Sequence, residues 1–327
     1  MKYIHLKDTD LNLSNICLGT VNFGEKLNRE QTFEILDEFV RLGGNFLDTA
    51  NVYGRWVAPT FCNMSEKLIG EWMKKRGAYN NVVVATKGAH YDLSTPTVPR
   101  VEEKEIRIDI EDSLRTLGLD VLDFYWLHRD DLSKPIEEIM DVLENLRAEG
   151  KIRYYGLSNY TVERLEQARN YLQKKGLKGP YGVSNQWSLA EVDSGKETSA
   201  DPTMVPCTSE EYEWHRETQV PLMPYSSTAF GLFEKMRRTG VQVCGGELLS
   251  GGIFEAEYPN LFEIYWNEKN LQTYEKLLEV QKETGHSMHA LSVAWLFSHP
   301  FQVFGLGSVR SCEQLKELAE ASEIEWD

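Results

Sequence analysis

Short apolar segments alternate with amphipathic segments along almost the whole 327-residue chain. Eight of the apolar segments are nearly continuous in hydrophobicity, which is typical of parallel strands that are buried on both faces. They cover residues 15–19, 44–50, 81–88, 121–128, 152–159, 181–186, 221–227 and 302–308. We therefore predict eight buried parallel strands.

The segments between these strands have the spacing of amphipathic helices. In residues 29–43, the side chains of Phe33, Leu36 and Val40 fall on one face, and Gly43 follows as a stop. Residues 65–77 are expected to begin with Ser65 as a cap and to end at Gly77. The same pattern of a polar or proline start and a glycine end recurs in residues 103–118, 135–150 and 161–176. The more apolar residues 289–300 are expected to pack on an outer wall.

Eight strand–helix units in about 300 residues favour a closed parallel barrel over an open doubly wound sheet. The predicted fold is α/β, a (β/α)8 TIM barrel, with residues 1–15 as an N-terminal hairpin that plugs its bottom. No linker or low-complexity run divides the chain, so residues 1–327 are expected to form a single domain. Two long irregular segments, 189–206 and 240–270, are expected at the top of the barrel, where they would shape a pocket.

Composition and charge narrow the classes of partner. The formal net charge is −16, which argues against nucleic acid and anionic membrane as partners. No apolar run reaches the ~18 residues that a membrane span needs. Five widely scattered cysteines without zinc-like spacing indicate free thiols, no metal and a cytoplasmic location. The sequence leaves the oligomeric state open.

Polar residues end three consecutive predicted strands. Asp48, Lys87 and His128 fall at these strand ends, and Tyr53 lies in the loop just after Asp48. Taken singly, Asp48 is also explained as a turn cap, Lys87 as a solvated lysine and His128 as a polar group under a loop. Because the carboxyl ends of barrel strands meet at one face, the shared level of all four favours a joint site.

This arrangement suits proton transfer to a substrate oxygen. A free tyrosine has a pKa near 10, and a cationic Lys87 beside Tyr53 is expected to lower that pKa. Asp48 would hold Lys87 and compensate its buried charge. His128 would orient or hydrogen-bond the same oxygen. The four residues therefore predict protonation of an alkoxide during hydride transfer, or the reverse reaction.

Five segments resemble, in order, the motif series of the aldo-keto reductase superfamily: "FLDTANVYG", "VVVATKG", "FYWLHRDD", "LRAEGKIRYYGLSN" and "SVRSCEQLKE". The catalytic tetrad of that family falls on Asp48, Tyr53, Lys87 and His128. The resemblance implies a (β/α)8 barrel and NADP(H)-dependent reduction of aldehydes or ketones. It also implies that Tyr53 is the general acid.

The resemblance also implies a cofactor site across the barrel top. Ser158, Asn159 and Gln186 correspond to residues that hold the nicotinamide carboxamide, whose donors and acceptors suit short polar side chains. Tyr225 corresponds to the aromatic residue stacked beneath the nicotinamide ring. Ser226, in "SSTAFG", would contribute to a pyrophosphate loop, although an ordinary Ser/Gly loop is an alternative.

The expected adenosine end is less complete. The segment "GLGSVRSCEQLKEL" supplies Ser308 and, at the three positions that correspond to adenosine-binding residues of the family, Arg310, Gln314 and Leu318. Only Arg310 is cationic, and it could bind a 2′-phosphate in bidentate fashion. NADP(H) is therefore expected on the family resemblance, with NAD(H) as an alternative.

Trp56 and Trp187 are predicted beside the mouth, with Arg129 as a polar neighbour. Indole rings stack on the apolar faces of sugars, so a polyhydroxylated carbonyl, a sugar or a glycoside is one hypothesis for the small-molecule substrate. Simple wall packing of the tryptophans is the alternative. A rival function from another class is a non-catalytic, cofactor-binding regulatory or partner-binding subunit.

Overall fold

The computed structural model describes residues 1–58, 63–96, 98–193, 195–199, 201–245, 247–250 and 253–326. A parallel sheet of seven strands runs in the order β11-β3-β4-β5-β6-β7-β8. The strands are β3 (Ile16–Gly19), β4 (Phe46–Asp48), β5 (Val83–Gly88), β6 (Leu122–Leu127), β7 (Ile152–Ser158), β8 (Val183–Ser184) and β11 (Gly305–Ser308).

The segment predicted as a strand at 221–227 closes this sheet through isolated bridges. Leu222 forms parallel bridges to both Val183 and Val303, so it stands between β8 and the chain that leads into β11. A continuous strand does not form here because Pro221 and Pro224 have no N–H to give to a ladder. The prediction of a (β/α)8 barrel is confirmed, but its strands are mostly shorter than expected.

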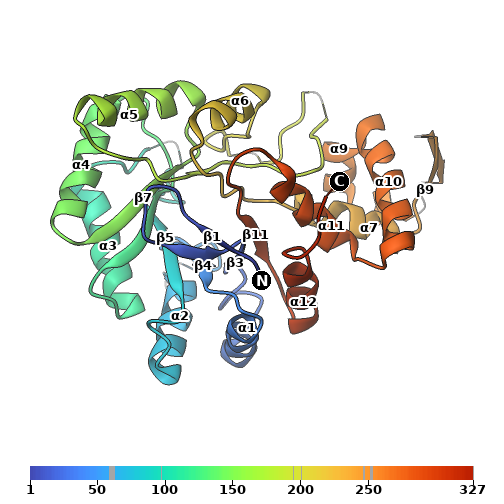
Figure 1. The fold of residues 1–327 in the computed structure, drawn as a ribbon, viewed down its shortest axis with the longest axis horizontal. Helices are drawn as coiled ribbons and strands as arrows, with labels where there is room; N and C mark the ends of the chain where they lie inside the picture. The colour runs from blue at the N-terminus through green and yellow to red at the C-terminus, as the bar shows by residue number, and fades with distance from the viewer. Residues whose placement is uncertain are drawn as a thin grey trace.

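Helices surround the sheet in chain order, as Figure 1 shows for α1 to α5. Helix α1 has a full capping box at Asn28, with Gln31 as the reciprocal partner. The predicted Ser65 cap is wrong, because α2 begins at Met64 and Ser65 is buried inside it, bonded to Thr20 Oγ1 at 2.7 Å. The helices that pack around the barrel are α1 (Arg29–Arg41), α2 (Met64–Arg76), α3 (Glu103–Leu117), α4 (Ile136–Ala148), α5 (Val162–Lys174), α6 (Ser209–Thr218), α11 (Met288–Ala294) and α12 (Cys312–Glu320).

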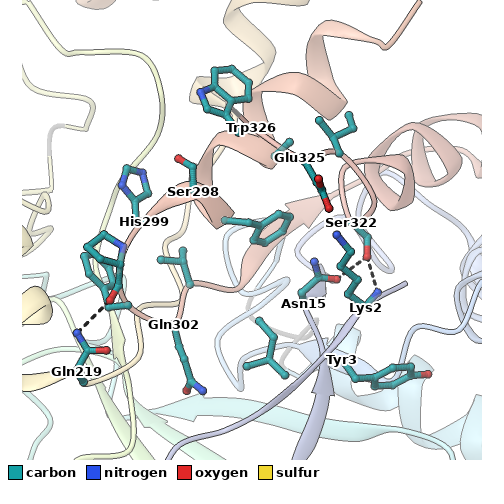
Figure 2. Close-up of a pocket in the computed structure, with 17 residues that line it drawn as sticks. Lys2, Tyr3, Asn15, Gln219, Ser298, His299, Gln302, Ser322, Glu325 and Trp326 are labelled. Atoms are coloured by element: carbon teal, nitrogen blue, oxygen red, sulfur yellow. Dashed lines mark hydrogen bonds between the residues drawn. The ribbon is translucent and has the colours of Figure 1, made fainter. Parts of the chain in front are cut away.

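The N-terminal hairpin is present as the antiparallel pair β1 (Tyr3–His5) and β2 (Asn12–Ser14). It borders a cavity of about 590 Å³ that is also lined by the chain before β11 and by the C-terminal segment. In Figure 2, the Lys2 amide donates to Ser322 Oγ, at 2.6 Å, and Ser322 Oγ bonds Asn15 Oδ1, at 2.7 Å. Asn15 precedes β3, so this cavity lies at the amino ends of the strands, opposite to the ends that carry the candidate site.

The segment 240–270 is more regular than predicted. It forms the hairpin β9 (Gln242–Cys244) and β10 (Glu247–Ser250), followed by α8 (Phe254–Glu257) and α9 (Pro259–Tyr265). Residues of β9, α8 and α9 form a second apolar cluster with α7 (Leu232–Arg238) and α10 (Glu268–Thr284), away from α3 and α4 in Figure 1. A local core therefore replaces the expected irregular loop.

The other insertion, 189–206, has no helix or strand among its described residues. It is hydrogen-bonded to α9 and α10 of this second cluster. The Asp193 amide donates to the Ile264 carbonyl at 2.8 Å, and Asn270 Nδ2 donates to the Glu191 carbonyl at 2.7 Å. In the described part of the chain, no helix is both long and apolar enough to cross a membrane.

Candidate active site

Three of the predicted residues meet at the carboxyl ends of β4 and β5. The parallel register sets Asp48 beside Ala85, so Lys87, two residues on, points to the same side of the sheet. Lys87 Nζ donates to Asp48 Oδ2, to the Thr49 carbonyl oxygen at 2.8 Å and to the Tyr53 hydroxyl at 3.2 Å. These bonds use all three protons of the ammonium group.

The environment keeps Lys87 charged and Tyr53 protonated. Burial alone would lower the pKa of Lys87, but the Asp48 carboxylate and Tyr53 raise it above its ordinary value. Burial raises the pKa of the Tyr53 phenol, and the positive charge of Lys87 opposes this shift. The expected net lowering of the Tyr53 pKa is therefore wrong, because burial outweighs the neighbouring cation.

His128 follows β6 and is a neutral imidazole. Burial lowers its pKa well below the ordinary value, and the charge of Arg129 adds to that effect. Its ring lies 4.8 Å, centroid to centroid, from the ring of His90, which bonds the Tyr91 carbonyl through Nδ1 at 2.9 Å. A neutral His128 can orient an oxygen by a hydrogen bond, whereas Tyr53 still carries its proton.

The residues expected to hold a nicotinamide amide form one hydrogen-bonded group. Asn159 Oδ1 accepts from the Tyr225 hydroxyl at 2.7 Å, and Asn159 Nδ2 donates to the His128 carbonyl and to Ser158 Oγ, each at 3.1 Å. Gln186 pairs with Tyr225 through a backbone bridge, and its Oε1 accepts from Thr198. Ser158, Asn159, Gln186 and Tyr225 are thus brought together, joined to His128 through its backbone.

The expected phosphate side lies around the end of β11. Ser308 ends this strand beside Gly19, where a Cβ would lie only 2.5 Å from Ser308 Oγ. Ser226 has a positive φ of 54° in the loop after Tyr225. The Arg310 amide donates to Gln314 Oε1 at 2.8 Å, and both of these residues are exposed.

A second cation at this end of the site was missed from the sequence. Burial lowers the pKa of Lys235, and the positive charge of Arg310 lowers it further. Lys235 Nζ lies 4.8 Å from the centroid of the Tyr258 ring, and no carboxylate of the described residues lies within ion-pair distance of it. Lys235 is therefore a candidate second cation near Arg310, which the expectation of a single cation did not include. Reading the helix that follows "SSTAFG" for basic residues would have found Lys235.

The three predicted substrate residues have different surroundings. The Trp56 ring lies 5.8 Å from the Tyr53 ring and is 45% exposed, and its Nε1 donates to Glu25 Oε2 at 2.7 Å. Trp187 packs against the rings of Trp295 and His299, at 4.7 and 4.6 Å, as a wall residue would. These contacts favour the alternative of wall packing for Trp187.

Arg129 holds a loop rather than facing the mouth with a free charge. Its Nε donates to Thr203 Oγ1 at 2.7 Å, and its Nη2 donates to Asp201 Oδ2 at 2.9 Å. The remaining nitrogen, Nη1, donates to the His128 carbonyl at 2.8 Å. Every nitrogen of the guanidinium group therefore has a protein acceptor, and these contacts favour a role of Arg129 in holding the loop at Asp201 and Thr203.

A family model described as the aldo/keto reductase family matches residues 15–327. The chain belongs to this family, and it is an oxidoreductase of the aldo-keto reductase type. The crystal structure of the thermostable aldo-keto reductase Tm1743 with the inhibitor epalrestat has the same fold, with a TM-score of 0.70 and 21% identity. The match covers 100% of this chain and 96% of that one.

Two curated relatives show the range of similarity. The uncharacterized oxidoreductase YrpG of Bacillus subtilis (strain 168) is 28% identical, over 100% of this chain and 93% of YrpG. The aryl-alcohol dehydrogenase [NADP(+)] of Phanerodontia chrysosporium is 35% identical, over 56% of this chain and 50% of its own length.

Proposed function

We propose that the protein interconverts a carbonyl and an alcohol, with NADP(H) as its cofactor and Tyr53 as the proton donor. The single observation that carries this proposal is the bonding of Lys87 to both Asp48 and the Tyr53 hydroxyl inside the barrel. A non-catalytic regulatory subunit has no need of a buried ammonium group aimed at a phenol. The rival function is therefore the weaker one.

The direction of the Lys87 bond has a consequence for Tyr53. Because Lys87 donates to the phenol oxygen, the proton of Tyr53 must point elsewhere, and the hydroxyl donates to none of the described residues. That proton is available to a substrate oxygen. When it leaves, the positive charge of Lys87 stabilises the phenolate that forms. Asp48 keeps Lys87 in place throughout.

His128 and Tyr53 would approach the same oxygen from two sides. The neutral imidazole would donate or accept a hydrogen bond there without supplying a full proton. The cofactor, when bound, would supply or accept hydride. In the oxidative direction the same groups work in reverse, with the Tyr53 phenolate accepting the alcohol proton.

The residues present fit NADP(H). Ser158, Asn159 and Gln186 would hold the carboxamide, with Tyr225 against the ring. At Asn159, an incoming amide must replace the Tyr225 hydroxyl or the Val205 N–H, which also donates to Asn159 Oδ1, at 3.0 Å.

At the other end, Ser226 and Ser308 would contact phosphate, and Gln314 the adenosine. Arg310 and Lys235 give two cations for a 2′-phosphate. This second cation strengthens the case for NADP(H) over NAD(H).

The proposed substrate contains a ring beside its carbonyl group. Trp56 supports this because its exposed indole adjoins Tyr53 and is held in place by Glu25. The name of the Phanerodontia relative points to aryl alcohols. The same indole would stack on a sugar, so sugars and glycosides stay in the proposal as a second substrate class.

The test is NADPH oxidation with 4-nitrobenzaldehyde and with a panel of sugars, repeated with NADH. We expect Tyr53→Phe to lower kcat about 1,000-fold or more, because general acid catalysis contributes about 10²–10⁴. NADPH binding, followed by protein fluorescence, should stay within about 2-fold. Absence of turnover by the folded wild-type protein with every substrate would favour the regulatory rival. Rapid turnover of apolar aldehydes but not sugars would reject the sugar class.

A further inference from the structure

Arg55 lies two residues after Tyr53 and has no carboxylate partner in the part of the chain that the structure describes. Its Nη2 donates to Asn51 Oδ1, and its Nε is buried without a hydrogen-bond partner in the described part of the chain. Among the described residues, no carboxylate oxygen lies within 4.0 Å of its nitrogens. The side chain is nevertheless half-buried.

This lack of a partner sets Arg55 apart from the other arginine near the mouth. Arg129 is bound by Asp201 and Thr203, so its charge is compensated. Burying part of a guanidinium group removes hydration, and that cost is normally offset by an ion pair or hydrogen bonds. At Arg55, Asn51 alone among the described residues offers such compensation. A ligand with several hydrogen-bond acceptors would supply the compensation that the protein does not give.

Arg55 lies in the same loop as Tyr53, the proposed proton donor, so a ligand bound to Arg55 would lie near the reacting groups. Trp56, the next residue, brings its half-exposed ring to 5.8 Å from the Tyr53 ring. The charge of Arg55 also lowers the pKa of His90, after burial and the charge of Arg129, and the His90 ring lies 4.8 Å from that of His128. Arg55 is therefore two residues from Tyr53 in the same loop and within electrostatic range of His90, which contacts His128.

Charge balance points to the same ligand chemistry. Near the Tyr53 hydroxyl, Lys87 is paired with Asp48, and Arg129 is paired with Asp201. Arg55 adds one uncompensated positive charge to this neighbourhood, although the chain as a whole carries −16. Two carboxyl groups, Glu66 and Asp92, feel the charge of Arg55, but neither comes within ion-pair distance. The Glu25 carboxylate, which binds the Trp56 indole, is paired with Lys26 at 3.8 Å. A charge that is left without an ion-pair partner among the described residues at Arg55 favours an anionic ligand.

We propose that Arg55 binds a carboxylate on the substrate, so that carbonyl compounds with a ring and an anionic group are the preferred class. This inference rests on the proposed carbonyl–alcohol reaction and names its substrate. Trp56 would contact the ring, and the guanidinium group would bind the carboxylate in the geometry that suits planar, bidentate recognition.

The experiment compares two aldehydes of nearly equal shape, 4-carboxybenzaldehyde and 4-nitrobenzaldehyde. Both substituents are planar and electron-withdrawing, but only the carboxylate is charged. We expect the wild-type ratio of kcat/KM, carboxylate over nitro, to fall about 10-fold in Arg55→Gln. Arg115→Gln, on the exposed face of α3, is the matched control and should keep the wild-type ratio. The wild-type ratio should also fall as salt is raised, because a half-exposed pair is screened.

Two outcomes would overturn the inference. An unchanged ratio in Arg55→Gln would show that the guanidinium group does not contact the carboxylate. A raised Kd for NADPH with an unchanged ratio would assign Arg55 to the cofactor. The proposed function fails separately, through absence of 4-nitrobenzaldehyde turnover by the folded wild-type protein. In that case, binding of 4-carboxybenzoate by calorimetry still tests Arg55, and equal affinity in wild type and Arg55→Gln would reject the site.

Discussion

The two faces of β5 bury a carboxyl group each, and burial raises the pKa of both, but of the two only Asp48 has a cation of the described residues beside it. On the inner face, Lys87 binds Asp48 and the pair is almost wholly buried. On the outer face, the neighbouring residue Thr86 donates to Oε1 of Glu66, at 2.5 Å. Glu66 is also fully buried, but no cation of the described residues comes within ion-pair distance of it. Burial raises its pKa to about 7.

This contrast shows what the lysine contributes. A buried carboxyl without a counter-ion resists ionisation, since low-dielectric surroundings disfavour the charged form. The Glu66 environment is therefore that of a structural group that holds its proton below about pH 7. With Lys87 beside it, the Asp48 carboxylate becomes the anchor of a cation that contacts the Tyr53 hydroxyl. Adjacent residues of one strand, Thr86 and Lys87, thus serve two separate purposes.

Lys87→Met should give the largest effect on the inner face. We expect kcat to fall about 100- to 10,000-fold, because the phenolate that forms during proton transfer loses its stabilising charge. The free energy of unfolding should also fall by about 3–5 kcal/mol, because Asp48 is left buried without its partner. Steady-state kinetics and urea unfolding measure the two effects.

The double variant Asp48→Asn/Lys87→Met separates these two roles. It removes both charges, so much of the lost stability should return while kcat stays low. A double variant that is as unstable as Lys87→Met alone would contradict the assignment of the loss to an unpaired carboxylate. A Lys87→Met protein with nearly normal kcat would remove Lys87 from the reaction.

The inner-face group could be predicted from the sequence because strand ends are visible in it. Asp48, Lys87 and His128 each follow an apolar run, and parallel strands bring such positions to one level. The net direction of the Tyr53 pKa could not be predicted, because it depends on the degree of burial. The role of Arg129 was missed for a related reason: its partner Asp201 is 72 residues away, in an insertion without a motif. Lys235 likewise comes within electrostatic range of Arg310 only through the fold.

Glu66→Gln tests the outer face, with a smaller effect that depends on pH. The folded pKa of about 7 lies above the value near 4.5 of an exposed glutamate. The folded protein therefore binds more protons than the unfolded chain between these two pH values, and the stability contributed by this proton is lost as pH rises from about 4.5 to 7. At 1.36 kcal/mol for each pKa unit, the loss is about 3 kcal/mol.

The glutamine side chain of the variant cannot ionise. We therefore expect the free energy of unfolding of Glu66→Gln, minus that of the wild type, to be larger at pH 8 than at pH 5. Urea unfolding of both proteins at the two pH values gives this difference, in which the titration of all other groups cancels. Glu213→Gln, on the exposed side of α6, is the matched control. Parallel pH profiles for wild type and Glu66→Gln would mean that Glu66 ionises normally in the folded protein.

Lys235 extends the comparison to a half-buried amine that lacks a carboxylate partner, and it should give the smallest effect. If its partner is the 2′-phosphate, Lys235→Met should raise the Kd for NADPH about 5- to 10-fold, as expected for one lost charge-assisted hydrogen bond near the surface. The Kd for NADH should change less than 2-fold, because NADH has no such phosphate. Fluorescence titration measures both constants without turnover, and Lys276→Met on α10 is the control. Equal weakening of NADPH and NADH would assign Lys235 to the shared pyrophosphate instead. If Lys235 does bind the 2′-phosphate, it is, like Asp48 on the inner face, a partly or wholly buried charge that is stabilised by an oppositely charged partner. The difference is that the partner of Lys235 arrives with the cofactor.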